Sequence, residues 1–142
     1  MKAGLQMLAT LLTVIASSTG AMATAATVKT VQVTGGYTYS YTVAQPSDGR
    51  ATYLLLHGFP SSSYDWRHTI KDLTADGHGI IAPDILGYGA TSKPAAVEEY
   101  AQEKLSDHVA DILKHEGVGY VVGVGHDWYI YDSAKLNWLE HS

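Results

Sequence analysis

The stretch of this chain that most constrains its fold is a short apolar run that ends on an acid. Residues 121–128 read Val-Val-Gly-Val-Gly-His-Asp-Trp. A carboxylate at the tip of a buried strand is costly unless it has a specific use there. A strand followed by Gly-x-acid-x and a helix-forming tail matches a nucleophile elbow, a sharp turn that lifts one side chain above an α/β sheet. We predict that Asp127 is lifted in this way, and an acid in place of a serine favours attack on a saturated carbon over acyl transfer.

Composition is that of one globular domain and excludes several kinds of site. The chain has 142 residues, 46% of them hydrophobic and 16% charged, which suffices for a buried core. The net charge of −5, with no cluster of Lys or Arg, gives no reason to expect nucleic acid as a partner. Because the chain has no cysteine and its seven histidines lack a metal-ligand spacing, we predict neither a metal site nor a cofactor.

The first residues have the layout of a secretory signal peptide. Lys2 precedes an apolar run over residues 5–16, and Ala21-Met22-Ala23 places small residues at the −3 and −1 positions of a cleavage site. The run is short for a transmembrane helix. We expect residues 1–23 to be removed and the protein to be secreted, with a loosely apolar leader or an uncleaved anchor as the alternatives.

Residue patterning beyond the leader predicts an α/β fold with a mostly parallel sheet and an antiparallel start. Alternating or continuous apolar runs indicate strands, and apolar residues at helical spacing indicate helices. We expect strands at residues 27–33, 37–43, 51–56, 79–82 and 120–124, and helices around residues 66–73 and 105–113. Gly35-Gly36 reads as the turn of an initial hairpin, and the alternation that follows indicates parallel strands joined by helices.

Three loops are expected at the carboxyl ends of the strands, where the chemistry of such sheets gathers. They comprise residues 57–63, 83–94 and 125–128, and all three are rich in Gly, Pro or unusual polar residues. This coincidence is the main argument from the residues for a site at the carboxyl end of the sheet.

The same loops carry motifs that resemble the α/β-hydrolase superfamily, and within it the soluble epoxide hydrolases and haloalkane dehalogenases. The motifs are His-Gly-Phe-Pro at 57–60, Pro-Asp-Ile-Leu-Gly-Tyr-Gly-Ala-Thr-Ser-Lys-Pro at 83–94 and Gly-His-Asp-Trp at 125–128. The resemblance runs from about residue 31 to 128. Dehalogenases commonly place another residue where Phe59 stands, which favours an epoxide hydrolase or a fluoroacetate-type dehalogenase, and Trp128 favours the former.

The resemblance implies a two-step hydrolysis of a small epoxide or halide. Asp127 would attack a substrate carbon to form an ester, which needs no base because carboxylates are charged at neutral pH. Water activated by a histidine would then hydrolyse the ester, and the backbone N–H groups of Phe59 and Trp128 would stabilise the oxyanion. The residues expected to shape the loops are His57, Gly58, Pro60 and Gly125.

Other interpretations of these polar residues stay open. Asp127 could be an ordinary N-cap of the helix that follows it. His57 and His126 fit a structural, hydrogen-bonded role better than that of a catalytic base. Asp84 fits a loop hydrogen-bonding role better than that of a catalytic acid.

The resemblance ends at Trp128. Tyr129 stands where the elbow has a small residue, usually Gly, because strand and helix approach closely there. We therefore expect residues 24–128 to be the N-terminal half of a hydrolase domain and residues 129–142 to be a divergent tail. The catalytic histidine, the orienting acid and the cap would then be absent. The strand before Asp127 would be an unpaired sheet edge, through which the protein could self-associate.

Two classes of function follow. The first is an α/β-hydrolase of epoxide hydrolase type, incomplete or inactive as given, with a haloalkane or haloacid dehalogenase as its variant. The second is a non-catalytic secreted hydrolase-like module or a dead gene product. A serine esterase is disfavoured because no serine lies in a Gly-x-Ser-x-Gly context.

Overall fold

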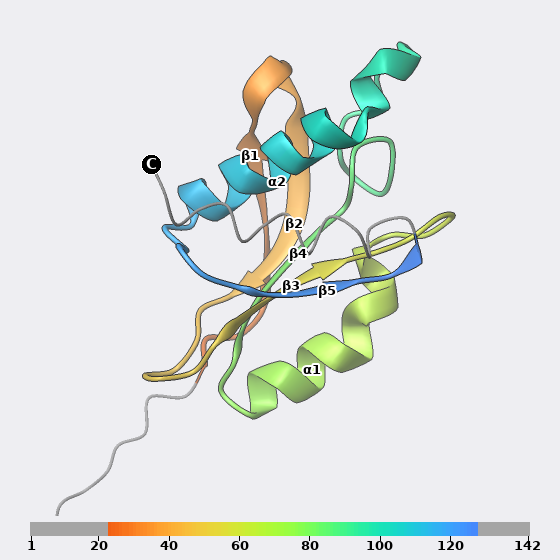
Figure 1. Ribbon diagram of the computed structural model, residues 1–142. Coiled ribbons are helices and arrows are strands. Elements are labelled where there is room, and N and C mark those ends of the chain that lie inside the picture. Colours follow the sequence, from red (N-terminus) through yellow and green to blue (C-terminus); the bar gives the residue numbers. More distant parts are fainter. Residues whose placement is uncertain (1–22, 128–142) are drawn as a thin grey trace, which may run out of the picture.

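A five-stranded sheet with a helix on each face organises the part of the chain that the computed structural model describes, residues 23–127 (Figure 1). The strands are β1 (Thr27–Gln32), β2 (Thr38–Ala44), β3 (Thr52–Leu56), β4 (Gly79–Pro83) and β5 (Val122–Gly125). The helices are α1 (Arg67–Ala75) and α2 (Gln102–His115). The leader, Trp128 and the tail at 129–142 lie outside the described residues.

The strand order is β1-β2-β4-β3-β5. The pairs β1–β2 and β2–β4 are antiparallel, whereas β3 pairs in parallel with both β4 and β5. All strands except β2 therefore point the same way. The predicted mostly parallel sheet, with its antiparallel hairpin at the start, is confirmed.

The hairpin between β1 and β2 turns on glycines. A 3₁₀ turn over Thr34–Gly36 joins the two strands, and Gly35 and Gly36 have φ angles of 83° and 79°. Glycine adopts this left-handed region without the steric cost that a Cβ brings. The turn sets a register that pairs Val31 with Tyr39, and Tyr39 points into the core with none of its surface exposed.

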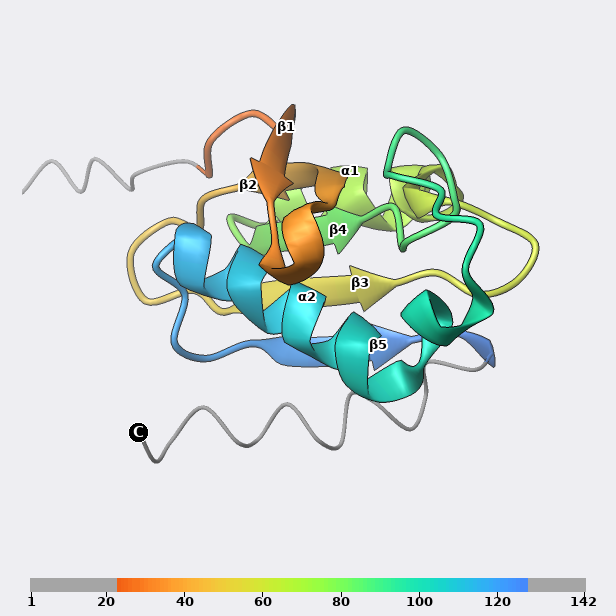
Figure 2. The ribbon, with the colours of Figure 1, turned by 90° about the horizontal axis from the view of Figure 1, so that it is seen from above.

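The two faces of the sheet carry separate cores, one beneath each helix (Figure 2). The larger core, on the α2 side, is formed by buried residues that include Tyr39, Tyr41, Leu54, Leu56, Ile81, Val109, Ile112 and Leu113. The smaller core, on the α1 side, is formed by Ala44, Leu55, Ile70, Ile80 and Ala82. Because β3 and β4 bury side chains on both faces, their sequences are nearly continuous apolar runs.

The end of α2 is tied to the hairpin by one buried carboxylate. Glu116 accepts hydrogen bonds from Lys29 Nζ at 2.9 Å and from the Tyr41 hydroxyl at 2.6 Å. Burial raises the pKa of Glu116, but the bonds from Tyr41 and Lys29 outweigh it and hold that pKa below its ordinary value. The carboxylate therefore stays charged and fastens the helix end to β1 and β2.

Most element boundaries differ from the sequence expectations by one to three residues, and three of the differences bear on the site or its strand. The last strand begins at Val122, and Tyr120 before it is 73% exposed. Trp66 ends a 3₁₀ turn over Ser63–Trp66, so α1 starts one residue later. Gly125, expected to shape a loop, is instead the last residue of β5, because its backbone pairs with Leu56. Across residues 23–127, neither helix has the length and apolarity that a membrane crossing requires.

Candidate active site

The loops that follow β3 and β5 meet at the carboxyl end of the sheet. Asp127 lies two residues beyond β5, and Phe59 lies in the loop after β3. The backbone N–H of Phe59 donates a hydrogen bond to Asp127 Oδ2 at 3.2 Å, across 68 positions of the sequence. The fold therefore brings together the predicted nucleophile and one of the two predicted oxyanion donors. Trp128, the other donor, lies outside the described residues.

Asp127 has an unusual backbone conformation. Its φ is 62°, and no other non-glycine residue within 23–127 has a positive φ. Residues other than glycine occupy this region rarely, and such strain concentrates at functional sites. An N-cap residue normally has extended backbone, so this conformation differs from that of an ordinary cap. It is the backbone of a tight turn that carries an exposed carboxylate.

Position 58 has no room for a side chain larger than that of glycine. A Cβ at Gly58 would lie 2.6 Å from the Cβ of Asp127 and 2.9 Å from His126 Nδ1. Such distances are shorter than any that real side chains tolerate. Gly58 thus allows the β3 loop to approach the Asp127 turn, while the backbone N–H of His126 extends the pairing to Leu56 O at 3.0 Å.

His57 is buried and fully engaged by backbone groups. Its Nε2 lies 3.0 Å from the N–H of Ile85, and its Nδ1 lies 2.9 Å from the carbonyl oxygen of Gly58. Because an N–H can only donate, Nε2 must be the acceptor, and the ring hydrogen therefore sits on Nδ1 and is donated to Gly58. Neither nitrogen remains to take a proton from water beside Asp127.

Asp84 joins the loops after β3 and β4. Its Oδ1 accepts the N–H of Ser63 at 2.9 Å, and its Oδ2 accepts the N–H of Ala90 at 3.0 Å. Burial raises the pKa of Asp84, but the hydrogen bonds from Ser63 and Ala90 outweigh it, and the pKa lies below its ordinary value. Gly89 packs against the carboxylate, where a Cβ would come within 1.9 Å of Oδ2.

The loops after β3 and β4 each contribute one aromatic ring. Phe59 is 65% exposed, and its ring meets the edge of the Tyr88 ring with centroids 6.5 Å apart. Tyr88 also meets the His57 ring edge-on at 5.3 Å. The pair offers an apolar surface next to the amide that contacts Asp127. Sequence reasoning placed Tyr88, Ser63 and Ala90 in the predicted loops but gave them no role. The backbone N–H groups of Ser63 and Ala90 bind Asp84, which no side-chain pattern marks.

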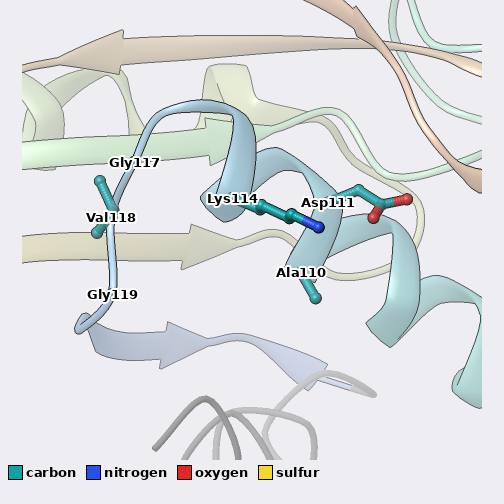
Figure 3. Close-up of a pocket in the computed structure, with 6 residues that line it drawn as sticks. All are labelled: Ala110, Asp111, Lys114, Gly117, Val118 and Gly119. Carbon is teal, nitrogen blue, oxygen red and sulfur yellow. The ribbon is translucent and has the colours of Figure 1, made fainter. Parts of the chain in front are cut away.

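The described residues suggest no second chemical centre. No group of three or more His, Cys, Asp or Glu in residues 23–127 is arranged to hold a metal ion. An open hollow of about 360 Å³ lies beside the end of α2 and the segment that leads into β5 (Figure 3). It is lined by Ala110, Asp111, Lys114, Gly117, Val118 and Gly119. This hollow precedes β5, whereas Asp127 follows it, so the hollow is separate from the Asp127 turn.

Comparison with known proteins identifies the family. The model of the alpha/beta hydrolase fold matches residues 53–128, just over half of the chain. The chain belongs to the α/β-hydrolase fold family. The matched range contains Phe59, Asp84 and Asp127.

Among characterised α/β-hydrolases, this chain is similar to epoxide hydrolases. It is 41% identical over 80 residues to epoxide hydrolase A of Mycobacterium tuberculosis, covering 56% of this chain and 25% of that protein. An epoxide hydrolase of Neurospora crassa is 38% identical over 109 residues, covering 71% of this chain and 30% of the relative. The chain therefore spans about a quarter to a third of the length of these relatives.

Solved structures show the same similarity. An epoxide hydrolase of Vigna radiata superposes with a TM-score of 0.67 at 33% identity, covering 80% of this chain and 33% of that one. An epoxide hydrolase from an endophytic Streptomyces has a TM-score of 0.70 at 32% identity, with 79% and 34% covered. The arrangement of strands and loops described above is thus that of the N-terminal part of an epoxide-hydrolase-like α/β-hydrolase.

Proposed function

We propose that this chain carries the nucleophile portion of an epoxide hydrolase-type active site, with Asp127 as the nucleophile on an elbow. The observation that carries the proposal is the hydrogen bond from the Phe59 amide to Asp127 Oδ2, at a residue with a φ of 62°. The similarity to epoxide hydrolases supports the class of reaction.

In the first step, Asp127 forms an ester with the substrate. The Phe59 N–H holds Oδ2, which leaves Oδ1 to attack an epoxide carbon. A new carbon–oxygen bond forms, the ring carbon–oxygen bond breaks, and the ring oxygen takes a proton from solvent. The exposed ring of Phe59, with the half-buried Tyr88 ring against it, suits an apolar substituent on the substrate.

In the second step, water would add to the ester carbonyl and place a negative charge on Oδ2. The Phe59 N–H already lies within hydrogen-bonding distance of that oxygen and would stabilise the charge. The added water needs a base, and both ring nitrogens of His57 are occupied. Within residues 23–127 we assign no base to this step, and we propose that the ester accumulates instead of turning over.

Intact mass spectrometry tests this proposal directly. The full chain is incubated with styrene oxide, and the expected product is a single adduct that peptide mapping places on Asp127. The control is Asp127→Asn, which keeps a side chain tolerant of the left-handed backbone but lacks the nucleophilic carboxylate. An adduct elsewhere contradicts the role of Asp127, and continuing release of diol contradicts the accumulation of ester.

A non-catalytic role is the second candidate, and the edge of the sheet favours it. Within residues 23–127, β5 pairs only with β3, and its sequence contains neither a charge nor a proline. Natural edge strands are commonly protected by such residues. We propose that the protein self-associates through the free edge of β5, which sedimentation as a function of protein concentration measures.

We also propose that residues 1–23 direct export and are removed. The support is the apolar run with its small-residue cleavage site. The backbone N–H of Thr24 donates to Gln45 O, and the N–H of Gln45 donates to Thr24 Oγ1 at 2.7 Å, so a new terminus at Thr24 would be held beside the sheet. N-terminal sequencing of the exported protein should begin at Thr24, and a product beginning at Met1 contradicts this proposal.

A further inference from the structure

His57 is connected to Asp127 through a single peptide unit. The Nδ1–H of His57 donates to the carbonyl oxygen of Gly58 at 2.9 Å. The N–H of Phe59 belongs to the same peptide bond as that carbonyl, and it donates to Asp127 Oδ2 at 3.2 Å. This peptide is trans, so its C=O and N–H point in opposite directions within one plane. A group that holds the carbonyl therefore also aims the N–H.

From this geometry we propose that His57 is a positioning residue that orients the Gly58–Phe59 peptide, so that the Phe59 N–H holds Asp127 Oδ2 and leaves Oδ1 placed to attack. The proposal rests on the proposed function of Asp127 and adds a specific role for a residue outside the reacting groups. His57 itself does not touch the substrate or exchange a proton.

The loop after β4 sets the state of the His57 ring. The N–H of Ile85 points at Nε2 from 3.0 Å and requires that nitrogen to be the acceptor. The hydrogen must then be on Nδ1, the nitrogen that faces Gly58 O. If the ring hydrogen were on Nε2, that donor would face the N–H of Ile85, which is also a donor. Nδ1 and the carbonyl oxygen of Gly58, both acceptors, would then face each other. The Ile85 amide thus selects the tautomer that can orient the peptide.

The surrounding residues hold this chain of hydrogen bonds in place. His57 is 1% exposed, and the Tyr88 ring packs edge-on against it. Asp84 fastens the two loops together a few residues away through the N–H groups of Ser63 and Ala90. A chain of hydrogen bonds therefore runs from Ile85 through His57 and the Gly58–Phe59 peptide to Asp127. Bonds in such a chain polarise one another and strengthen together.

Two substitutions at His57 separate its two hydrogen bonds. In His57→Asn, the side-chain amide can replace Nδ1 and donate to Gly58 O, but it cannot reach Ile85. In His57→Gln, the longer side chain can replace Nε2 and accept from Ile85, but the bond to Gly58 O is lost. Each variant removes one hydrogen bond from a buried site. If His57 had only a structural role, the rate of Asp127 alkylation would fall in each variant only as far as its folded fraction falls.

The proposal predicts that the two variants differ in rate. We expect His57→Gln to lower the limiting rate of Asp127 alkylation by styrene oxide by about ten- to a hundredfold, because the amide is no longer aimed. We expect His57→Asn to keep most of the rate, even where the two variants are equally destabilised. Limiting rates come from intact mass at saturating epoxide, and urea unfolding gives the folded fraction. Equal limiting rates in folded His57→Gln and His57→Asn overturn the proposal.

His78 supplies a matched control. Its Nδ1 lies 3.3 Å from the carbonyl oxygen of Ala51, so it also holds a backbone carbonyl, but at the opposite end of the sheet from Asp127. His78→Asn and His78→Gln should both alkylate at the rate of the unsubstituted chain. A loss of rate in these variants equal to that in His57→Gln overturns a specific role for His57.

Nitrogen-15 NMR of the full chain decides the proposal independently of chemistry at Asp127. The His57 hydrogen should be on Nδ1, and exchange of the Phe59 amide with solvent should quicken about tenfold or more in His57→Gln but not in His57→Asn. If the unsubstituted chain is never alkylated at Asp127, the proposed function fails, but these measurements still test whether His57 orients the Gly58–Phe59 peptide. If neither variant folds, the tautomer of the unsubstituted chain decides, and a hydrogen on Nε2 overturns the proposal.

Discussion

At the scale of single residues, Gly58 and Gly89 are required by the close approach of other groups. Gly58 faces the Cβ of Asp127, and Gly89 faces the carboxylate of Asp84. The two positions differ in backbone, because only Gly89 has a positive φ, of 48°. Substitution at Gly58 therefore tests space alone, whereas substitution at Gly89 adds backbone strain.

Gly58→Ala should impair the Asp127 turn more than the stability of the fold. The added methyl group would displace Asp127, and a displacement of about 1 Å lowers a rate by about a hundredfold. The measurement is the rate of adduct formation with styrene oxide. Gly119→Ala is the control, because a Cβ there meets nothing within 4 Å. If Gly58→Ala is alkylated at the rate of the unsubstituted chain, the added methyl group does not displace Asp127 and the prediction is wrong.

Gly89→Ala should destabilise the protein by roughly 2–5 kcal/mol. A left-handed alanine costs about 1–2 kcal/mol, and breaking the buried bonds of Asp84 costs about 1–3 kcal/mol more. Gly117→Ala serves as the control, because Gly117 has a φ of 68° with open space around it and should show the backbone cost alone. Urea denaturation measures both, and equal losses would mean that the Asp84 contact contributes nothing.

At the scale of elements, α2 places one buried histidine against the hairpin. His108 is 3% exposed, and its Nδ1 lies 3.1 Å from the Tyr39 hydroxyl. Burial lowers the pKa of His108 below its ordinary value, although Asp111 and Asp107 act to raise it. The folded protein therefore favours the neutral ring more than the unfolded chain does.

Stability should consequently fall as the pH drops below about 6.5, the ordinary pKa of histidine. Below this pH the unfolded chain binds more protons at this position than the folded protein does, so protons favour unfolding. His108→Asn keeps an acceptor for Tyr39 but cannot titrate. It should flatten the dependence between about pH 7.5 and about pH 5.5, as measured by urea unfolding. An unchanged slope in the variant would assign the effect to other groups.

At the scale of the whole molecule, the sheet has one protected and one exposed lateral edge within residues 23–127. The β1 edge carries Lys29, whereas β5 at the other edge has no charged residue and its Val122 is 40% exposed (Figure 2). An uncharged edge strand is a template for pairing with another chain. Association through β5 is therefore the expected behaviour of the isolated protein.

Val122→Lys should weaken this association. A lysine at the edge introduces charge repulsion and a desolvation cost when two strands approach. Analytical ultracentrifugation should show that the unsubstituted chain grows in mass with concentration and that the variant remains smaller. Val97→Lys is the control, because Val97 is 81% exposed but lies in the turn before α2. A monomeric unsubstituted chain at every concentration would contradict the expectation.

Much of the fold and the position of the site could be predicted from local patterns. Alternating residues indicated the hairpin, and short apolar runs indicated β3, β4 and β5. The three motif loops were assigned to the carboxyl end of the sheet. These features depend on neighbouring residues, whose periodicity is determined by strand and helix geometry. The family resemblance also depends on motifs within the chain, which is why the comparisons confirm it.

The connections within the site depended on the tertiary structure. Sequence reasoning placed His57 and Gly58 in a loop-shaping role, but not the peptide plane that His57 holds or the Cβ of Asp127 that Gly58 clears. It also assigned Gly125 to a loop that the β3 pairing makes part of a strand.

The amino-acid sequence by itself determined which segments become strands, helices and loops, because local periodicity and turn residues specify them. Only the tertiary structure decided that the Phe59 amide meets Asp127 and that Ile85 sets the tautomer of His57. These contacts join residues far apart in the chain. Their directions depend on how β3, β4 and β5 align in the sheet, which no local pattern encodes.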